Sequence, residues 1–232
     1  MAELTRQYIE ESLKSSGAKL NLAGADLSGL DLSGLDLSGF NLAGAKLEGV
    51  KLFDCQLRNA HLSGATLTQA DLHQANLSGV NLQGSNLSGA NLSDTYLLKA
   101  DLREANLSSA NLAKAKLDEA TLTAANLGQA NLDRAFLVRA NLSQANLNGA
   151  NLNGANLKNA HLEGANLSGA NLDEAFLEGA VVTGAILVGA KLRSANFNQV
   201  VYDHETRWEA GFNPAAAGAV EKKKKKLFGL FG

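Results

Sequence analysis

The sequence is poor in residues that usually stabilise a globular domain. Its 232 residues include one cysteine, one proline, one tryptophan and one methionine, and aromatic residues make up only 5%. A lone cysteine, Cys55, excludes an intramolecular disulfide framework, so burial of apolar side chains must stabilise the fold. Hydrophobic residues still make up 45% of the chain. Leu and Ala therefore supply nearly all of the apolar volume.

A strong excess of charge of either sign is also missing. The formal net charge is −2 at pH 7. This balance implies neither a strongly basic nucleic-acid binder nor a strongly acidic mimic, because either function depends on a large field of one sign. We therefore expect no direct contact with nucleic acid.

Long apolar runs are absent. The segment from Met1 to Lys14 carries charges throughout and has no apolar core of the secretory type. No run is long enough to cross a bilayer as a helix. The sequence therefore predicts a cytoplasmic location.

What the chain does contain is a leucine at every fifth residue. From Leu22 to Phe197 in steps of five, 34 of 36 positions are Leu, and no insertion breaks the spacing. On an α-helix successive leucines would lie about 140° apart, and on a flat strand they would alternate between faces. All of them stay inside if the chain turns a corner once per pentapeptide. The period thus predicts a solenoid around a leucine-filled axis, with three or four sides.

Two further positions repeat with the leucine. The residue two places before it is Ala at 27 of 36 positions, as expected for a crowded inner corner. The residue directly before it is Asn or Asp at 22 of 36 positions, and these side chains suit turns because they bond to local backbone. Cys55 occupies the Ala position and is predicted to be a small buried hydrophobe. The last two positions of each unit should face solvent.

This motif, as in Ala75-Asn76-Leu77-Ser78-Gly79, resembles the A(N/D)LXX repeat of the pentapeptide-repeat family, which is abundant in cyanobacteria. The resemblance covers residues 18–200. It implies an all-β solenoid, a right-handed quadrilateral β-helix with four pentapeptides per coil and about nine coils, which would be roughly 40 Å long.

Both ends of a solenoid need covers, because their backbone groups and leucines lack a neighbouring coil. Leu4, Tyr8, Ile9 and Leu13 follow helical spacing, which predicts an N-terminal helical cap over residues 3–16 within a segment 1–17. Bulky residues in the Ala position of the first coils should widen or plug that end: Leu20, Leu30, Leu35 and Phe40. Residues 201–220, which include Trp208, should form a C-terminal closing segment.

The final residues, 221–232, are expected to form a polybasic and apolar tail. Two interpretations remain open for it: a solvated, disordered end, or an anchor to an anionic membrane surface or a partner. The candidate anchor residues are Lys222, Lys223, Lys224, Lys225, Lys226, Leu227, Phe228, Leu230 and Phe231. The second interpretation would place the protein peripherally on the cytoplasmic face of a membrane.

No motif for catalysis, a metal or a cofactor is found. The histidines do not converge: His61 and His161 lie 100 residues apart, and His73 and His204 have no obvious partner. The glycines follow the repeat and mark turns, so they form no phosphate-binding loop. An unbroken repeat predicts no pocket for a nucleophile and base. We therefore expect a protein that is not an enzyme and binds no cofactor.

Residues 20 apart should stack on one face, and one such column departs from the Asn/Asp rule. It contains Tyr96, Lys116, Phe136, Asn156 and Phe176. Its rings either shield the coil surface or form a partner-binding face made by Tyr96, Lys116, Phe136 and Phe176. Val181 and Ile186 are similar exceptions and mark a candidate interface, with a homodimer as one occupant.

Two functions fit these observations. The first is a non-enzymatic scaffold or adaptor that binds a protein partner, still unidentified, through flat faces. The second is implied by the resemblance, because some family members mimic DNA and protect a topoisomerase, gyrase. Residues 20–200 carry 16 acidic and 12 basic residues, a net charge of −4, which is weak for a duplex mimic.

Overall fold

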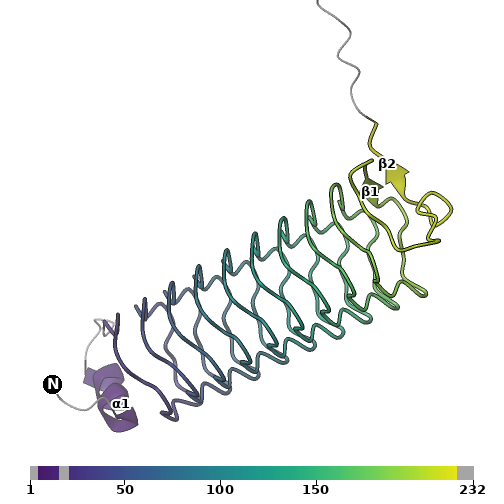
Figure 1. The fold of residues 1–232 in the computed structure, drawn as a ribbon. Helices are drawn as coiled ribbons and strands as arrows, with labels where there is room; N and C mark the ends of the chain where they lie inside the picture. The colour runs from purple at the N-terminus through teal and green to yellow at the C-terminus, as the bar shows by residue number, and fades with distance from the viewer. Residues whose placement is uncertain (1–4, 16–20, 224–232) are drawn as a thin grey trace, which may run out of the picture.

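The computed structural model describes residues 5–15 and 21–223, and it shows a straight rod of stacked coils (Figure 1). Parallel bridges join residues 20 apart, from Asn21 with Asn41 to Phe176 with Asn196. Twenty residues per coil are four pentapeptides, so the rod has four sides. The choice between three and four sides, which the leucine period leaves open, is thereby settled.

Each coil is bonded to both neighbours by the same backbone pattern. In a central unit the Leu147 amide donates to the Asn166 carbonyl at 2.7 Å, and the Asn146 amide donates to the Ala125 carbonyl at 2.9 Å. The corner is closed by the Ala150 amide, which donates to the Leu147 carbonyl at 3.0 Å. Neighbouring coils thus satisfy the backbone groups along the rod, which makes it a rigid body.

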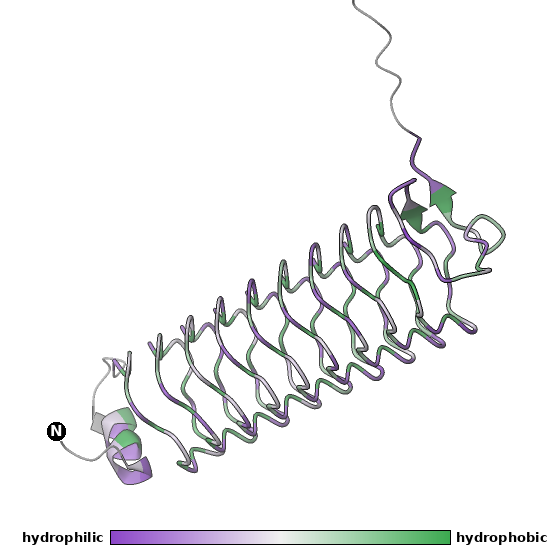
Figure 2. Cartoon of the chain, viewed as in Figure 1, coloured by the Kyte–Doolittle hydropathy of each residue, from purple (hydrophilic) through white to green (hydrophobic). Residues whose placement is uncertain are grey.

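The interior is filled as the repeat predicts. At every fifth residue, the leucines from Leu27 to Leu187 are at most 1% exposed, and the alanines from Ala100 to Ala185 are equally buried. Figure 2 shows apolar and polar residues alternating along every coil. Cys55 is fully buried, its thiol contacts the Leu32 carbonyl oxygen at 2.9 Å, and burial raises its pKa to about 11. The prediction of a buried cysteine is confirmed.

The turn chemistry explains the other two repeated positions. The Asn76 side-chain oxygen accepts a hydrogen bond from the Ser78 amide at 3.1 Å, and the same contact recurs along the rod. The last residue of each unit has a positive φ, such as 68° at Gly79 and 60° at Gln144. Glycine is favoured there because the left-handed conformation carries no penalty without a Cβ.

Helix α1, Arg6–Ser15, lies across the N-terminal end of the rod. Thr5 caps it, because its hydroxyl oxygen accepts from the Tyr8 amide at 3.2 Å. Ile9 is fully buried and Leu13 packs against the core, whereas Tyr8 is 42% exposed. Tyr8 follows the helical spacing that predicted this cap, but it is covered less than Ile9. Leu4 lies outside the described residues.

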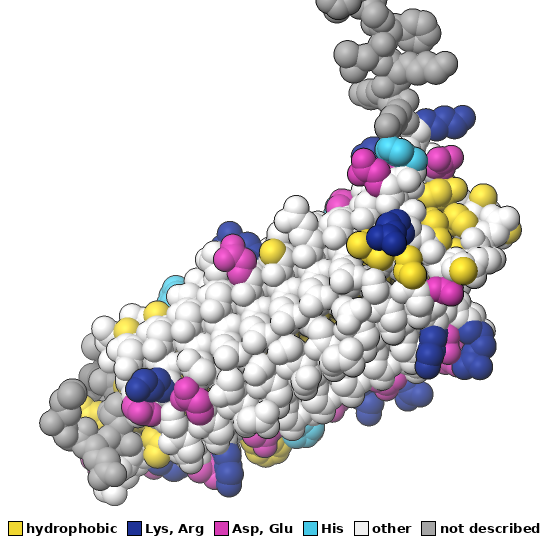
Figure 3. Space-filling view, in the orientation of Figure 1, with side chains coloured by type: hydrophobic (Ala, Val, Ile, Leu, Met, Phe, Trp, Pro, Cys, Tyr) yellow, Lys and Arg dark blue, Asp and Glu magenta, His cyan; other side chains and the backbone are white. Residues whose placement is uncertain are grey.

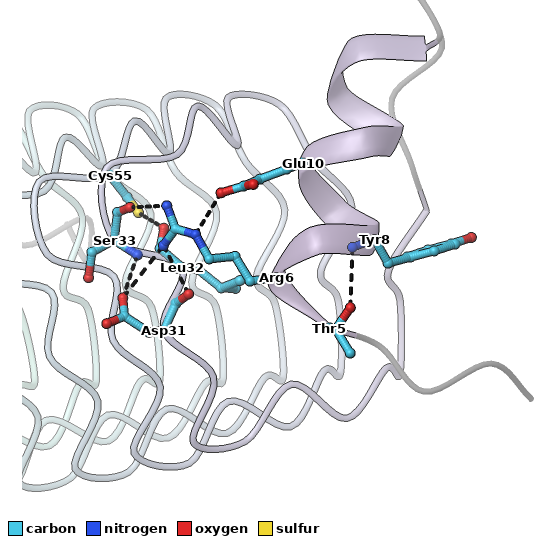
Figure 4. A network of polar contacts seen from close by, with 8 residues as sticks. All are labelled: Thr5, Arg6, Tyr8, Glu10, Asp31, Leu32, Ser33 and Cys55. Atoms are coloured by element: carbon cyan, nitrogen blue, oxygen red, sulfur yellow. Dashed lines mark hydrogen bonds and ion pairs between the residues drawn. The ribbon is translucent and has the colours of Figure 1, made fainter.

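Arg6 fixes α1 to the open edge of the first coil (Figure 4). Its guanidinium donates to the carbonyl oxygens of Asp31 and Ser33 at 3.0 and 3.2 Å, and it also bonds to Glu10 at 2.6 Å. Within residues 5–15 and 21–223 no backbone amide bonds to these two carbonyls, so Arg6 takes the place of a neighbouring coil. Leu30 and Leu35 are partly buried against the core nearby, and Phe40 is buried. Leu20 is not among the described residues.

The C-terminal end is closed by a different device. Strands β1, Val201–Tyr202, and β2, Val220–Glu221, pair in parallel and continue the ladder beyond the last full coil. Between them the ring of Trp208 lies 5.7 Å from Phe197, and Phe212 lies 5.0 Å from Phe197. These rings cover the buried Phe197. None of the helices in residues 5–15 and 21–223 has the length and apolarity needed to span a bilayer.

Candidate functional site: a corner lined by aromatic residues

The departing column forms one continuous line on the outside of the rod. Bridges connect Tyr96 with Lys116, Lys116 with Phe136, Phe136 with Asn156, and Asn156 with Phe176. The predicted stacking of these residues is therefore confirmed. The three rings remain exposed, at 39% for Tyr96, 43% for Phe136 and 54% for Phe176.

The rings are not equivalent in their surroundings. Lys116 covers Tyr96, with its Nζ atom 3.9 Å from the ring centroid, which is a cation–π contact. Phe136 and Phe176 contact no other ring in the described part of the chain. Asn156 separates them by two coils, or about 10 Å. These two phenylalanines are therefore exposed apolar surface that no neighbouring ring covers.

A second column runs beside the aromatic one, two residues earlier in the chain, across the corner occupied by buried alanines. Together the two columns enclose an open hollow of about 430 Å³. Its lining residues are Arg134, Phe136, Gly154, Asn156, Glu174 and Phe176. The unbroken repeat predicted no pocket for a nucleophile and base, and it did not predict an open surface hollow of this kind. The hollow forms because Gly154 and Asn156 are small while the residues above and below them are large.

A second, more polar hollow of about 350 Å³ adjoins it toward the N-terminus. It is lined by Asp54, Gln74, Asp94, Tyr96, Lys114 and Lys116. We call the surface between the columns Asp94–Glu174 and Tyr96–Phe176 the aromatic groove. The column from Asp94 to Glu174 was missed in the sequence. Its signal was available, because these residues stand two places before the aromatic column with the same spacing of 20.

The charged side chains of the aromatic groove differ from those of the neighbouring columns in their ion pairing. On neighbouring columns, opposite charges pair between adjacent coils, as for Lys99 with Glu119 at 3.6 Å and Lys158 with Glu178 at 3.1 Å. In the described part of the chain, the side chains of Lys114, Arg134 and Glu174 form no ion pair or hydrogen bond. The groove thus presents unpaired cations beside unpaired rings.

Another side of the rod has the opposite character. From residue 66 to 169 its outward positions are Asn, Ser, Thr, Gln and Gly only, and Figure 3 shows a broad area with charges confined to its ends and edges. We call this surface, which carries the column Thr66–Asn166, the neutral face. Its asparagines bond to one another: the Asn126 amide donates to Asn106 at 3.2 Å, and Asn146 donates to Asn126 at 2.9 Å. The side-chain amides of these asparagines thus find hydrogen-bond partners within the molecule.

The histidines and carboxylates offer little chemistry. Within residues 5–15 and 21–223, no three His, Cys, Asp or Glu side chains converge as metal ligands do. His73, expected without a partner, stacks on Phe53 at 5.7 Å and its Nδ1 lies 2.9 Å from the Ser93 hydroxyl. His161 contacts Glu163 at 3.1 Å. His61 and His161 share one column, five coils apart, as the repeat predicts.

The remaining candidate residues lie toward the C-terminal end. Val181 and Ile186 are half-buried on two different sides of the rod, so they form no joint patch. Lys222 and Lys223 are exposed directly after β2, and the Lys222 amide donates to the Tyr202 carbonyl at 2.7 Å. The rest of the candidate anchor lies outside the described residues: Lys224, Lys225, Lys226, Leu227, Phe228, Leu230 and Phe231.

Comparison with known proteins is consistent with this geometry. A model of pentapeptide repeats matches in eight copies over residues 21–55, 55–94, 85–123, 122–159 and 160–199. The crystal structure of HetL from Nostoc sp. strain PCC 7120, a pentapeptide repeat protein involved in regulating heterocyst differentiation, is 32% identical. The match covers 86% of this chain and 98% of HetL, with a TM-score of 0.51.

Two further solved structures are similar. Alr5209, a pentapeptide repeat protein from Nostoc PCC 7120, is 37% identical over 44% of this chain and 84% of its own, with a TM-score of 0.44. QnrB1, a plasmid-mediated fluoroquinolone resistance protein, is 18% identical over 85% of this chain and 94% of its own, with a TM-score of 0.49. Among curated proteins no sequence matches this one.

Proposed function

The chain belongs to the pentapeptide-repeat family, whose fold is a right-handed quadrilateral β-helix, and from this premise we propose that it is a non-enzymatic scaffold or adaptor. It binds a protein partner through the aromatic groove. The observation that supports this proposal is the pair of free, exposed rings at Phe136 and Phe176. The similarity to HetL, a protein involved in regulation, is in line with such a role.

The fold does not require a ring at this position of the repeat. Asn is the commonest residue in that position of the repeat, and it supports both the turn and the ladder elsewhere on the rod. Phe gives up these hydrogen bonds and leaves about half of its ring in water. Buried aromatic anchors dominate the binding energy of protein interfaces. A partner that covers both rings would recover the apolar surface that the rod leaves exposed.

The rod also suits binding because it is preorganised. Its coils are held by repeated backbone hydrogen bonds of 2.6–3.1 Å in the central region, so little conformational entropy is lost when a partner docks. The two rings keep a fixed separation of two coils. A flat, rigid surface with a fixed spacing favours one partner geometry over others.

The proposal is tested by affinity capture with the full-length protein. The double variant Phe136→Asn/Phe176→Asn restores the commonest residue of the repeat, and we expect it to capture the partner at least tenfold less efficiently. Phe53→Asn is the control for loss of an exposed ring, because Phe53 is 40% exposed and stacks on His73 in another column. The partner is then titrated in purified form against all three proteins. Capture of the same proteins in equal yield by the double variant would refute the proposal.

DNA mimicry with protection of a topoisomerase is the alternative, and the charge distribution gives it less support. Residues 20–200 have a net charge of −4, and the neutral face lacks charge over its central coils. A duplex presents one negative charge per roughly 1.7 Å of its axis. In a gyrase supercoiling assay with a quinolone, we expect no protection by this protein.

We further propose that the C-terminal lysines tether the rod to an anionic membrane. Lys222 and Lys223 are exposed, and three more lysines and an apolar stretch follow in the sequence. Each lysine near such a surface contributes about 1 kcal/mol. The test is co-sedimentation with vesicles that contain phosphatidylserine. The full-length chain should bind, and a variant ending at Lys223, which keeps β2, should not. Equal sedimentation of both would exclude the tail as the tether.

A further inference from the structure

We propose that the aromatic groove binds an extended peptide segment of its partner, and that this segment presents an acidic and an apolar side chain two residues apart. The inference rests on the proposed function and adds the kind of partner. It depends on three features of the groove: the hollow between the two rings, the cations beside the hollow, and the distance from the hollow to the cations.

The hollow accepts one apolar side chain. Phe136 forms one wall and Phe176 the other, and the coil between them contributes only Gly154 and Asn156. Gly154 has no side chain, and the stem of Arg134 lies beside it, with Cγ 3.4 Å from the position that a Cβ would take, so these two residues form the floor of the hollow. Two rings about 10 Å apart leave room for a single aliphatic or aromatic side chain in contact with both. A small side chain would leave the ring faces uncovered.

The cations accept a carboxylate. The backbones of Lys114 and Arg134 lie on adjacent coils, about 4.8 Å apart along the rod, and Lys116 follows Lys114 by two residues. Like charges opposite one another on adjacent strands destabilise each other. An anion placed between them converts this repulsion into attraction. On the neighbouring columns the chain itself supplies the opposite charge, but here it does not.

The cationic patch has room for only a short acidic segment. Asp94 lies one coil beyond Lys114 toward the N-terminus, and Glu174 lies two coils beyond Arg134 toward the C-terminus. These carboxylates would repel a longer run of negative charge. They favour one or two acidic residues in the ligand over a polyanion such as a nucleic acid.

The distance between the two subsites sets the spacing in the ligand. The midpoint between the coils of Lys114 and Arg134 lies about one and a half coils from the hollow, or roughly 7 Å along the axis. In an extended peptide, side chains on one face are two residues or about 6.6–6.8 Å apart. A peptide that runs along the rod therefore places an acidic residue at the cations and an apolar residue, two positions away, in the hollow.

The experiment selects ligands without prior assumption about their sequence. Phage that display random ten-residue peptides are selected on the full-length protein and, in parallel, on Phe136→Asn/Phe176→Asn. We expect the wild type alone to enrich Asp or Glu two positions from Phe, Trp, Leu or Tyr. Enrichment without this spacing, or equal enrichment on the double variant, would overturn the inference.

A charge exchange tests the cationic subsite directly. A selected peptide, labelled with fluorescein, should bind Arg134→Glu at least tenfold more weakly in fluorescence anisotropy, and replacing its acidic residue by Lys should restore much of the affinity. Arg139→Glu is the control, because it makes the same charge change outside the groove. Unchanged binding to Arg134→Glu would refute the assignment.

The two proposals fail in different ways. If no peptide is selected but capture of a partner still depends on Phe136 and Phe176, the groove binds a folded surface, and only this inference falls. If capture is also independent of the rings, the proposed function falls with it.

Discussion

The neutral face and the aromatic groove are two outer surfaces of one rod. Beneath both lie the same buried leucines and alanines, and behind both runs the same ladder of backbone hydrogen bonds. On the neutral face, asparagines bond to their own backbone and to each other. In the aromatic groove, rings and unpaired charges replace them.

The comparison of these two surfaces shows which positions of the repeat the fold requires and which positions can vary. The coil needs a small corner residue, a buried leucine and a residue that tolerates the turn. Asn at the outer position adds hydrogen bonds, but Phe136 and Phe176 show that the coil also forms without them. Residues that leave such bonds unused and expose apolar surface are therefore best explained by a partner, and the predictions below test this separation.

The largest loss of stability should come from substitutions of buried alanines. We expect the loss to be equal beneath the aromatic groove and beneath the neutral face. Ala135 lies beneath the aromatic groove and Ala145 beneath the neutral face, and both are fully buried. Replacing either by Leu overpacks the corner and should destabilise the protein by about 1–3 kcal/mol. Chemical denaturation followed by circular dichroism measures the change. A cost at one position only would show that the two corners are packed differently.

A smaller effect is expected from the hydrogen bonds of the neutral face. Asn126 accepts from the Gly128 amide and from Asn146, and it donates to Asn106. Asn126→Ala removes all three bonds at a partly exposed site and should destabilise the protein by about 1 kcal/mol. The same denaturation measurement applies. An unchanged midpoint would mean that water replaces these bonds without loss.

A still smaller effect on stability is expected where the groove is returned to the commonest residue. Phe136→Asn removes an exposed ring and offers an amide to Asn156, so the free energy of unfolding should change by less than about 0.5 kcal/mol. Partner capture should fall sharply in the same variant. A destabilisation as large as that of Asn126→Ala would show that the ring shields the coil and is structural.

The sequence predicted the interior better than the surface, and the reason is physical. The period of five determines which side chains are buried, so Cys55 and the leucine column were placed correctly. The aromatic column also followed from the spacing of 20. The hollow did not, because it depends on the heights of side chains in two columns, Gly154 and Asn156 against Arg134 and Phe136. The exposure of Tyr8 depends on how α1 docks on the first coil, which the helical spacing does not determine.

The smallest expected effect is also the one of opposite sign. Arg134→Glu places a carboxylate beside Lys114, so it replaces a like-charge contact by an attractive one and should stabilise the rod by less than about 0.5 kcal/mol. The gain should shrink in 1 M NaCl, because salt screens exposed charges. Arg139→Glu makes the same charge change outside the groove but beside Glu119, so this variant should show no gain in stability. Thermal unfolding at low and high salt measures both variants. If Arg134→Glu makes the rod more stable and weakens peptide binding, Arg134 serves binding at a small cost in stability. If the variant is less stable, Arg134 has a partner within the fold.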